Sequence, residues 1–211
     1  MIPSKTEMQK ALSCRVGEDI ASRLNGSKVA VLGLGGLGSN VCIALARAGV
    51  GHLIICDFDK VDITNLNRQQ YKASQIGMKK TDALKENLLE IAPYIDVITV
   101  DKKVSEENIY EICKDADVIC EAFDKADNKA MLVNFVLEKM PGKYIVSASG
   151  LAGFGSMNEI RTRKMSDRFY LCGDLVSDVN DGIGLVSARV MGCASHEAQT
   201  ILRILTGEED E

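Results

Sequence analysis

The stretch that most constrains the fold is a short apolar run that leads directly into closely spaced glycines. Residues 28–32 read Lys-Val-Ala-Val-Leu, and Gly33, Gly35, Gly36 and Gly38 follow at once. Glycines in this pattern allow a tight turn, let the backbone approach a phosphate and let a helix pack closely on a strand. The N-terminus of a helix that opens after such a turn offers free N–H groups and a partial positive charge to an anion. The stretch therefore predicts a strand, a turn and a helix that together bind a phosphate.

A carboxylate stands where it could hold the ribose of a nucleotide. Asp57 lies 19 residues after Gly38, close to the spacing of about 20 that is typical of a ribose-binding acid, and it directly follows a second apolar run over residues 53–56. Asp59 follows in the same polar segment and is a second candidate. A nucleotide is therefore the predicted ligand, and the glycines alone leave open which nucleotide it is.

Segments typical of strands and of helices alternate along most of the chain. Strands are predicted at 28–32, 53–56, 96–100, 117–121 and 144–147, and helices at about 39–48, 79–91, 105–114 and 126–139. This alternation predicts a Rossmann-like, doubly wound parallel sheet of the α/β class with right-handed crossovers. Two short strands near 157–163 and 168–171, with no helix between them, predict an antiparallel C-terminal extension.

The two ends of the chain are expected to be a helix and a disordered tail. One helix is predicted over about 5–24, because apolar residues recur every four positions there; they are Met8, Leu12, Val16, Ile20 and Leu24. A final helix is expected over about 185–205, and the acidic tail 207–211 is expected to be disordered. With 211 residues, the whole chain, 1–211, is expected to form a single domain.

Composition and charge argue against several classes of function. The net charge is −5 and there is no basic run, which disfavours a protein that binds the phosphate backbone of nucleic acids. No apolar run approaches the ~18 residues read as a membrane span, and the N-terminal residues are too polar for a signal peptide. A cytoplasmic protein without a membrane partner is therefore expected.

The cysteines and histidines form no pattern typical of a metal site. The chain has seven cysteines and two histidines, no two cysteines have C-x-x-C spacing, and the histidines complete no ligand cluster. Structural zinc is therefore not expected. An odd number of cysteines in a chain expected in the cytoplasm also argues against disulfides.

Three polar runs follow predicted strands or open a predicted helix. They cover residues 65–70 (Asn-Leu-Asn-Arg-Gln-Gln), 77–80 (Gly-Met-Lys-Lys) and 121–124 (Glu-Ala-Phe-Asp). Ligands of such sheets bind outside the carboxyl ends of the strands, so these runs are expected to converge near the glycine turn. A simple dinucleotide-binding protein does not need them.

Taken together, these motifs resemble the ThiF/MoeB family, the bacterial relatives of ubiquitin-activating enzymes. They are, in order, Gly33-Leu-Gly-Gly-Leu-Gly38, Ala48-Gly-Val-Gly51, Asp57-Phe-Asp59, Asn65-Leu-Asn-Arg-Gln69, Gly77-Met-Lys-Lys80 and Asp124. The chain is similar to a short ThiF-type protein over residues 1 to about 206. The resemblance implies a homodimer that uses ATP and Mg²⁺ to adenylylate the C-terminal carboxylate of a small ubiquitin-fold sulfur carrier ending in Gly-Gly, in thiamine biosynthesis or a similar pathway.

The resemblance also implies roles for individual residues near the phosphates. Asp57 matches the ribose-binding aspartate, and Arg68 and Lys80 match a pair of cations that holds the phosphates. Asn65 and Gln69 match residues that line the phosphate site. In the implied reaction a carboxylate binds the α-phosphate and pyrophosphate leaves, so fixed cations and backbone donors can stabilise the added charge without a protein nucleophile.

Three further residues carry roles that are less well matched. Asp124 matches the carboxylate that holds Mg²⁺, although it could also cap the helix that starts near residue 125. Arg15 matches an arginine that reaches into the partner subunit's site, but the Arg-x-x-Arg-Gln pattern of MoeB-type members is missing around it. The C-x-x-C zinc motifs of MoeB-like members are also missing. Cys172 is the one cysteine predicted in a loop, and hence the only one considered for thioester or persulfide chemistry.

Three alternative functions remain open. The first is a dehydratase of a modified tRNA base in the same superfamily, which the acidic net charge disfavours. The second is a non-catalytic module that binds a nucleotide or a carrier, which the short C-terminal region favours. The third is a nicotinamide-dependent oxidoreductase, which would share the glycine pattern but leave Arg68, Lys80 and Asp124 unexplained.

Overall fold

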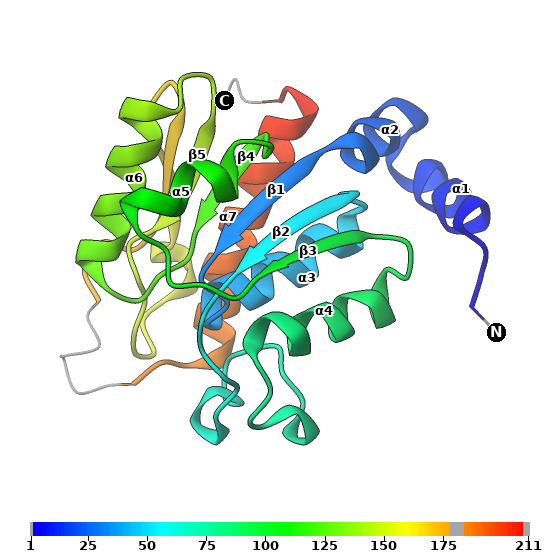
Figure 1. The fold of residues 1–211 in the computed structure, drawn as a ribbon. Coiled ribbons are helices and arrows are strands. Elements are labelled where there is room, and N and C mark those ends of the chain that lie inside the picture. Colours follow the sequence, from blue (N-terminus) through cyan, green and yellow to red (C-terminus); the bar gives the residue numbers. More distant parts are fainter. Residues whose placement is uncertain (1, 178–183, 209–211) are drawn as a thin grey trace.

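Seven strands form one sheet that is covered by helices on both faces (Figure 1). The computed structural model describes residues 2–177 and 184–208. The strands are β1 (Lys28–Leu32), β2 (His52–Cys56), β3 (Asp96–Val100), β4 (Val118–Glu121), β5 (Tyr144–Ala148), β6 (Arg161–Ser166) and β7 (Phe169–Gly173). Their order across the sheet is β3-β2-β1-β4-β5-β7-β6, and every neighbouring pair is parallel except β6 with β7. The predicted Rossmann-like α/β class with an antiparallel C-terminal extension is confirmed.

The helices divide between the two faces of the sheet. They are α1 (Lys5–Val16), α2 (Glu18–Gly26), α3 (Gly36–Ala48), α4 (Lys80–Ile91), α5 (Glu106–Cys113), α6 (Ala126–Lys139) and α7 (Ser187–Thr206), with short 3₁₀ turns η1 (Ile63–Asn65), η2 (Ala73–Gln75) and η3 (Met157–Glu159). Helices α3, α4 and α7 share one hydrophobic core with the sheet, and α5 and α6 share the other. No helix among the described residues combines the length and hydrophobicity that crossing a bilayer requires.

The central strand β1 explains why the sheet needs both layers. Val29 and Val31 pack into one core, whereas Ala30 and Leu32 pack into the other, and all four are fully buried. A continuous apolar strand of this kind is stable only when helices cover both faces. The chain runs from β1 to β2 and β3 on one side and then crosses to β4 and β5 on the other. The end of β1 is therefore the topological switch point, where such sheets bind ligands.

The single helix expected over 5–24 is wrong, because the chain forms two helices there. Gly17 has a φ of 91°, in the left-handed region, and it separates α1 from α2. None of the residues of α1 is buried, whereas α2 buries Ala21 and Leu24. The four-residue apolar spacing continues across Gly17, so spacing alone could not reveal the break.

Other differences from the prediction concern element ends. Helix α3 begins at Gly36 rather than near residue 39, and β6 begins at Arg161 because Met157–Glu159 forms a 3₁₀ turn. Helix α7 ends at Thr206, followed by Gly207 in the left-handed conformation typical of a helix C-terminus. Of the tail that was expected to be disordered, residues 209–211 lie outside the described residues.

One carboxyl group on α7 is fully buried in the core. Glu197 Oε1 lies 3.8 Å from the Sγ atom of Cys120, which donates to it. Glu197 Oε2 has no hydrogen-bond partner within the described part of the chain. Burial raises the pKa of Glu197 to about 8, with a further upward contribution from the charge of Glu121 and an opposing one from Lys129. The group therefore holds its proton in the folded protein under conditions where an unfolded chain would lose it.

This shift makes the stability of the protein depend on pH. Between the pKa of an unfolded glutamate, 4.5, and the folded value near 8, the unfolded chain ionises first, so the group's contribution to stability falls as pH rises. We expect Glu197→Gln to gain stability relative to the wild type over this window and to show a constant difference above it. Urea unfolding of both proteins from pH 5 to pH 9 measures this, and a difference that is independent of pH would contradict it.

Candidate functional site

The glycine turn brings three chain segments closer than any other residue type would allow. Gly33 has a φ of 93°, its N–H donates to the carbonyl of Cys56 at 2.9 Å, and a Cβ atom there would lie 2.6 Å from the Ala122 carbonyl oxygen. A Cβ atom on Gly38 would lie 1.9 Å from the Gly33 carbonyl oxygen. Both contacts are shorter than real Cβ atoms make, so both positions require glycine. The ends of β1, β2 and β4 and the first turn of α3 therefore meet at one point.

The first turn of α3 is open to an anion. Gly35 precedes the helix as its N-cap residue and supplies no side-chain cap. The N–H groups at the start of a helix have no partner inside the helix, and together with the helix dipole they attract phosphate. A Cβ atom on Gly35 would lie 3.9 Å from Gln69 Nε2, and one on Gly36 would lie 2.9 Å from Val190 Cγ1. The turn is thus flanked by the loop after β2 and by α7.

Asp57 is held rigidly beside the turn. Its Oδ2 atom accepts from the Leu34 N–H at 2.7 Å, and its Oδ1 atom accepts from the Asp59 N–H at 2.8 Å. The residue is 8% exposed. A carboxylate oxygen can accept more than one hydrogen bond, so Asp57 can still accept from ribose hydroxyls. The structure thus places Asp57 directly after β2, against the backbone of the glycine turn.

Lys80 joins the same group from the start of α4. Its Nζ atom lies 2.9 Å from Asp59 Oδ2 and 3.8 Å from Asp57 Oδ2. The Lys80 side chain is 8% exposed, whereas that of Asp59 is 51% exposed. The structure therefore brings a buried ammonium group and two carboxylates together at the end of β2, next to the glycine turn.

Two polar atoms near the turn are buried without a partner in the described residues. They are Arg68 Nε and Gln69 Oε1. Arg68 Nη1, by contrast, donates to the carbonyl of Thr64 at 3.1 Å and to Asn67 Oδ1 at 2.8 Å. Burial lowers the pKa of the Arg68 guanidinium from its usual value. Leaving a buried polar group unpaired costs about 1–3 kcal/mol. The donor Arg68 Nε therefore fits an anionic oxygen, and the acceptor Gln69 Oε1 fits a hydroxyl or amino group.

A second layer of hydrogen bonds fixes the loop after β2 to the glycine turn. Asn40 Nδ2, on α3, donates to the carbonyl of Gly36 at 2.6 Å and to that of Arg68 at 3.0 Å. Gln70 Nε2 donates to Asn40 Oδ1 at 2.6 Å, and the Tyr71 hydroxyl donates to the Leu34 carbonyl at 2.7 Å. Sequence analysis identified neither Asn40 nor Tyr71. The sequence hinted at a role for these two residues only through their positions, because Tyr71 follows the polar run 65–70 and Asn40 follows the glycines.

The structure places three predicted site residues less directly. Asn65 Oδ1 accepts from the Asp62 N–H at 3.0 Å and caps the η1 turn. Asp124 is exposed in the connection between β4 and α6, and the N-cap of α6 is Lys125 instead. Arg15 is exposed on α1, which lies apart from the start of α3 in Figure 1. The neighbouring Leu12 contacts Gly49, at the opposite end of α3 from the glycine turn. Arg15 therefore does not reach this site within one chain.

A buried salt bridge positions the loop that carries Asp124. Glu121, at the end of β4, accepts from the Phe123 N–H at 2.7 Å and lies 3.1 Å from Lys129 Nζ on α6. The Ser147 hydroxyl on β5 also donates to it. Glu121 is fully buried, so these contacts connect the loop firmly to two strands and a helix.

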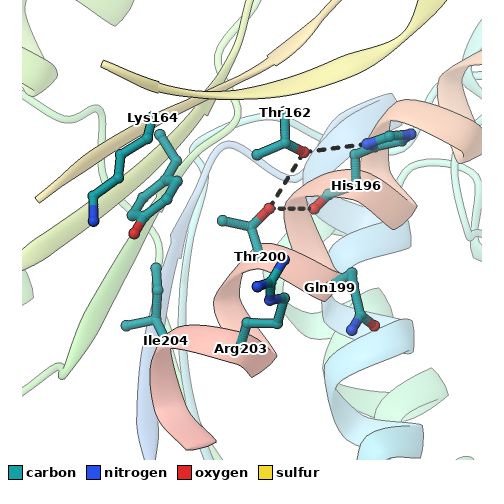
Figure 2. Close-up of a pocket in the computed structure, with 8 residues that line it drawn as sticks. Thr162, Lys164, His196, Gln199, Thr200, Arg203 and Ile204 are labelled. Atoms are coloured by element: carbon teal, nitrogen blue, oxygen red, sulfur yellow. Dashed lines mark hydrogen bonds between the residues drawn. The ribbon is translucent and has the colours of Figure 1, made fainter. Parts of the chain in front are cut away.

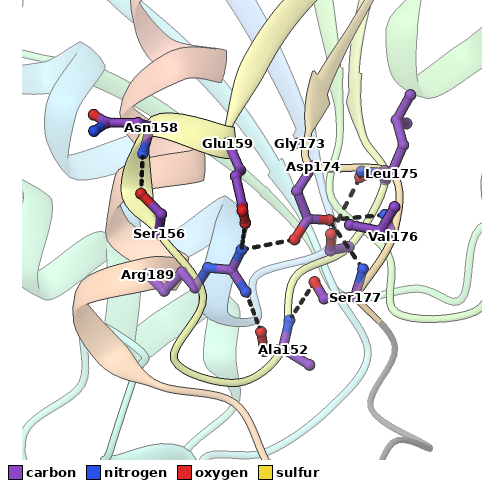
Figure 3. A network of polar contacts seen from close by, with 12 residues as sticks. Ala152, Ser156, Asn158, Glu159, Gly173, Asp174, Leu175, Val176, Ser177 and Arg189 are labelled. Carbon is purple, nitrogen blue, oxygen red and sulfur yellow. Dashed lines mark hydrogen bonds and ion pairs between the residues drawn. The ribbon is translucent and has the colours of Figure 1, made fainter.

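A second buried ion pair connects α7 to the loops after β5 and β7 (Figure 3). Arg189 Nη2 lies 2.7 Å from Asp174 Oδ2 and 3.6 Å from Glu159 Oε2, and Nη1 donates to the Ala152 carbonyl. Arg189 is 5% exposed. Sequence analysis did not identify this residue, because its partners lie in two separate connections, one between β5 and β6 and one after β7.

Cys172 is not the loop cysteine that the sequence suggested. It lies in β7, paired with Ala148 of β5, and it is fully buried. Burial raises the pKa of its thiol to about 12, with a further contribution from the charge of Glu197. Because the thiolate is the reactive form, Cys172 is not an accessible nucleophile in this structure.

A pocket of about 270 Å³ lies elsewhere, between α7 and the β6–β7 hairpin (Figure 2). It is lined by Thr162, Lys164, Tyr170, His196, Gln199, Thr200, Arg203 and Ile204. Thr162 Oγ1 lies 3.1 Å from His196 Nδ1 and 3.5 Å from Thr200 Oγ1, so the polar groups on its wall bind one another. None of the predicted site residues lines this pocket, and it is separate from the glycine turn.

The packing of the glycine turn makes Gly38→Ala a sharp test of the site. We expect this change to lower stability by about 2 kcal/mol or more, because backbone atoms must move to accept the new Cβ atom. Gly26→Ala is the matched control, since a Cβ atom at Gly26 would meet nothing within 4 Å. Thermal unfolding of both variants measures the difference. Equal melting temperatures would show that the turn is not packed as described.

Comparisons with known proteins identify the family and relatives of the chain. The ThiF family model matches residues 8–211. The adenylyltransferase and sulfurtransferase UBA4 of Lodderomyces elongisporus is 36% identical over 138 residues, covering 64% of this chain and 30% of that protein. The molybdopterin-synthase adenylyltransferase of Haemophilus influenzae is 36% identical, covering 54% and 47%. The tRNA threonylcarbamoyladenosine dehydratase of Bacillus subtilis is 39% identical, covering 59% and 50%. The matches thus span half or less of these relatives.

A solved structure has the same fold over the whole chain. The Escherichia coli tRNA N6-threonylcarbamoyladenosine dehydratase TcdA, in complex with ATP, matches with a TM-score of 0.85 and 20% identity. The match covers 99% of this chain and 98% of that one. Because the family model covers nearly every residue from the first helix to the last, the chain belongs to the ThiF family.

Proposed function

We propose that the protein uses ATP to adenylylate the C-terminal glycine carboxylate of a small ubiquitin-fold sulfur carrier. The observation that carries the proposal is the buried Arg68 Nε, a donor without a partner in the described residues, beside an uncapped helix N-terminus and a glycine turn. Gln69 Oε1, which is also unpartnered among the described residues, could accept from a hydroxyl or amino group of the same ligand. A triphosphate supplies the negative charge that such a site favours. Several relatives in the ThiF family are named adenylyltransferases, which supports this class of reaction.

The proposed chemistry needs positioning rather than a protein nucleophile. A carboxylate oxygen of the carrier forms a bond to the α-phosphorus, and the bond from that phosphorus to the bridging oxygen breaks as pyrophosphate leaves. Arg68, Lys80 and the N–H groups of α3 would neutralise the charge that builds on the phosphates. Lys80 already binds the half-exposed Asp59, and a phosphate oxygen would offer the same kind of partner. Asp57 would hold the ribose.

Mg²⁺ would be held by Asp124 together with phosphate oxygens. The described residues contain no cluster of three or more His, Cys, Asp or Glu that could bind a metal. Mg²⁺ commonly uses one or two carboxylates plus the phosphates of a bound nucleotide, so a single exposed carboxylate fits this arrangement. The ion would reduce the negative charge of the triphosphate as the carboxylate approaches.

The proposal extends to the assembly and the pathway. Arg15 is exposed on α1 and lies away from the site of its own chain, so we propose that it acts in the site of a second copy within a homodimer. A sulfur carrier of the ThiS type would place the reaction in thiamine biosynthesis, in the cytoplasm.

An RNA substrate is the second candidate. It is favoured by the 39% identity to the Bacillus subtilis dehydratase of a modified tRNA base. The net charge of −5 opposes it, because binding to an RNA backbone relies on basic side chains. Binding of tRNA in a gel shift at physiological salt would favour this candidate over the carrier.

ATP–pyrophosphate exchange tests the carrier proposal. Pull-down from the native cell supplies the candidate carrier, a small protein ending in Gly-Gly, and the exchange is measured with and without it. We expect exchange that depends on the carrier, and a loss of about 100-fold or more in Arg68→Ala and Lys80→Ala, because each removes a cation from the developing charge.

The matched control is Arg47→Ala. Arg47 is exposed in the last turn of α3, at the far end from the glycine turn, and its loss is expected to leave exchange unchanged. Exchange at the wild-type rate in Arg68→Ala or Lys80→Ala would contradict the assigned roles. Nucleotide binding without any adenylate product would favour a non-catalytic module instead.

A further inference from the structure

We propose that Asn67 is a positioning residue, which fixes the orientation of the Arg68 guanidinium and couples it to the chain segment that leads into α7. The inference rests on the proposed function, in which Arg68 binds the phosphates of ATP. The family resemblance assigns roles to Asn65, Arg68 and Gln69 but none to Asn67, the middle residue of Asn65-Leu-Asn-Arg-Gln69.

The hydrogen bonds of Arg68 are concentrated on one nitrogen. Nη1 donates both to the Thr64 carbonyl at 3.1 Å and to Asn67 Oδ1 at 2.8 Å. Nε is buried without a partner in the described residues. A guanidinium can bind a phosphate with two parallel N–H groups along one edge. Because Nη1 is already engaged, the edge that carries Nε is the one left for a ligand.

The stem of Arg68 is fixed as well. A Cβ atom on Gly36 would lie 3.5 Å from Arg68 Cγ and 3.6 Å from Cδ, so these carbons pack on the glycine turn. With the stem resting on backbone and Nη1 held by two oxygens, the guanidinium has little freedom to turn. Among the described residues, removal of Asn67 Oδ1 would leave Nη1 with the Thr64 carbonyl as its remaining acceptor.

The other end of the Asn67 amide reaches a distant part of the chain. Asn67 Nδ2 donates to the Leu185 carbonyl at 3.1 Å, just before α7 begins. The same helix start contacts the glycine turn, since a Cβ atom on Gly36 would lie 2.9 Å from Val190 Cγ1. Asn67 thus connects Arg68 and the start of α7, two groups that both pack against Gly36.

The position of Asn67 allows its role to be separated from folding. Asn67 is exposed, so its replacement leaves no cavity in the core. A side chain that acts through Arg68 should matter only while Arg68 is present. A double-mutant cycle measures this dependence directly, because the effects of two residues that act as a unit are not additive.

The experiment measures the affinity for ATP and for adenosine by calorimetric titration. We expect Asn67→Leu to weaken ATP binding about tenfold, as the loss of an oriented charge-assisted contact would, and to leave adenosine binding unchanged. In the Arg68→Ala background, Asn67→Leu should have no further effect on ATP affinity. Asn134→Leu, at an exposed asparagine of α6, is the matched control and should bind ATP as the wild type does.

The outcomes distinguish this inference from the proposed function. Suppose that the wild type binds ATP and that Arg68→Ala weakens this binding. The positioning role is then wrong, while the proposed function stands, if Asn67→Leu does not change ATP affinity. It is equally wrong if Asn67→Leu weakens ATP binding as much in the Arg68→Ala background as in the wild type. Equal weakening of ATP and adenosine by Asn67→Leu would likewise overturn the role, because it would indicate a general change in the site. If the wild type does not bind ATP, the proposed function itself fails.

Discussion

The close approach of backbone to backbone at the glycine turn is the contact on which the rest of the site depends. A Cβ atom at Gly38 would lie 1.9 Å from the Gly33 carbonyl, and one at Gly33 would lie 2.6 Å from the Ala122 carbonyl. Only glycine at these two positions lets β1, β4 and α3 come so close together. This packing sets the position of the free N–H groups of α3, and Asp57 reinforces it through the Leu34 N–H.

Buried polar groups have different surroundings in the core and at the candidate site. In the core, Glu197 on α7 accepts a weak hydrogen bond from the Cys120 thiol, and burial favours its neutral form. At the site, by contrast, ionisable side chains lie against polar partners: Lys80 Nζ lies 2.9 Å from Asp59 Oδ2 and 3.8 Å from Asp57 Oδ2, and Arg68 Nη1 donates to Asn67 Oδ1. The atoms that remain unpaired there lie next to the glycine turn. A phosphate could accept from Arg68 Nε at the place where the helix N-terminus also favours it, whereas Gln69 Oε1 requires a donor such as a hydroxyl or amino group.

Local sequence patterns predicted the sheet better than they predicted the element ends. The runs at 96–100 and 126–139 coincide with β3 and α6, because apolar periodicity follows directly from which face is buried. The break at Gly17 was missed, since the same periodicity continues on both sides of it. Cys172 was expected in a loop, but it lies in β7 because that strand pairs with β5, a contact between distant segments.

The sequence by itself determined the α/β class, the glycine turn and the likeness to the ThiF family, because these depend on short patterns whose spacing the backbone geometry dictates. Tertiary structure decided which side chains meet: Lys80 with Asp59, Asn67 with Leu185, and Arg189 with Asp174. These contacts join residues far apart in the chain, and they depend on the strand order and on how α7 packs against α3. No local pattern encodes that packing, so the orientation of Arg68 could be read only from the folded chain.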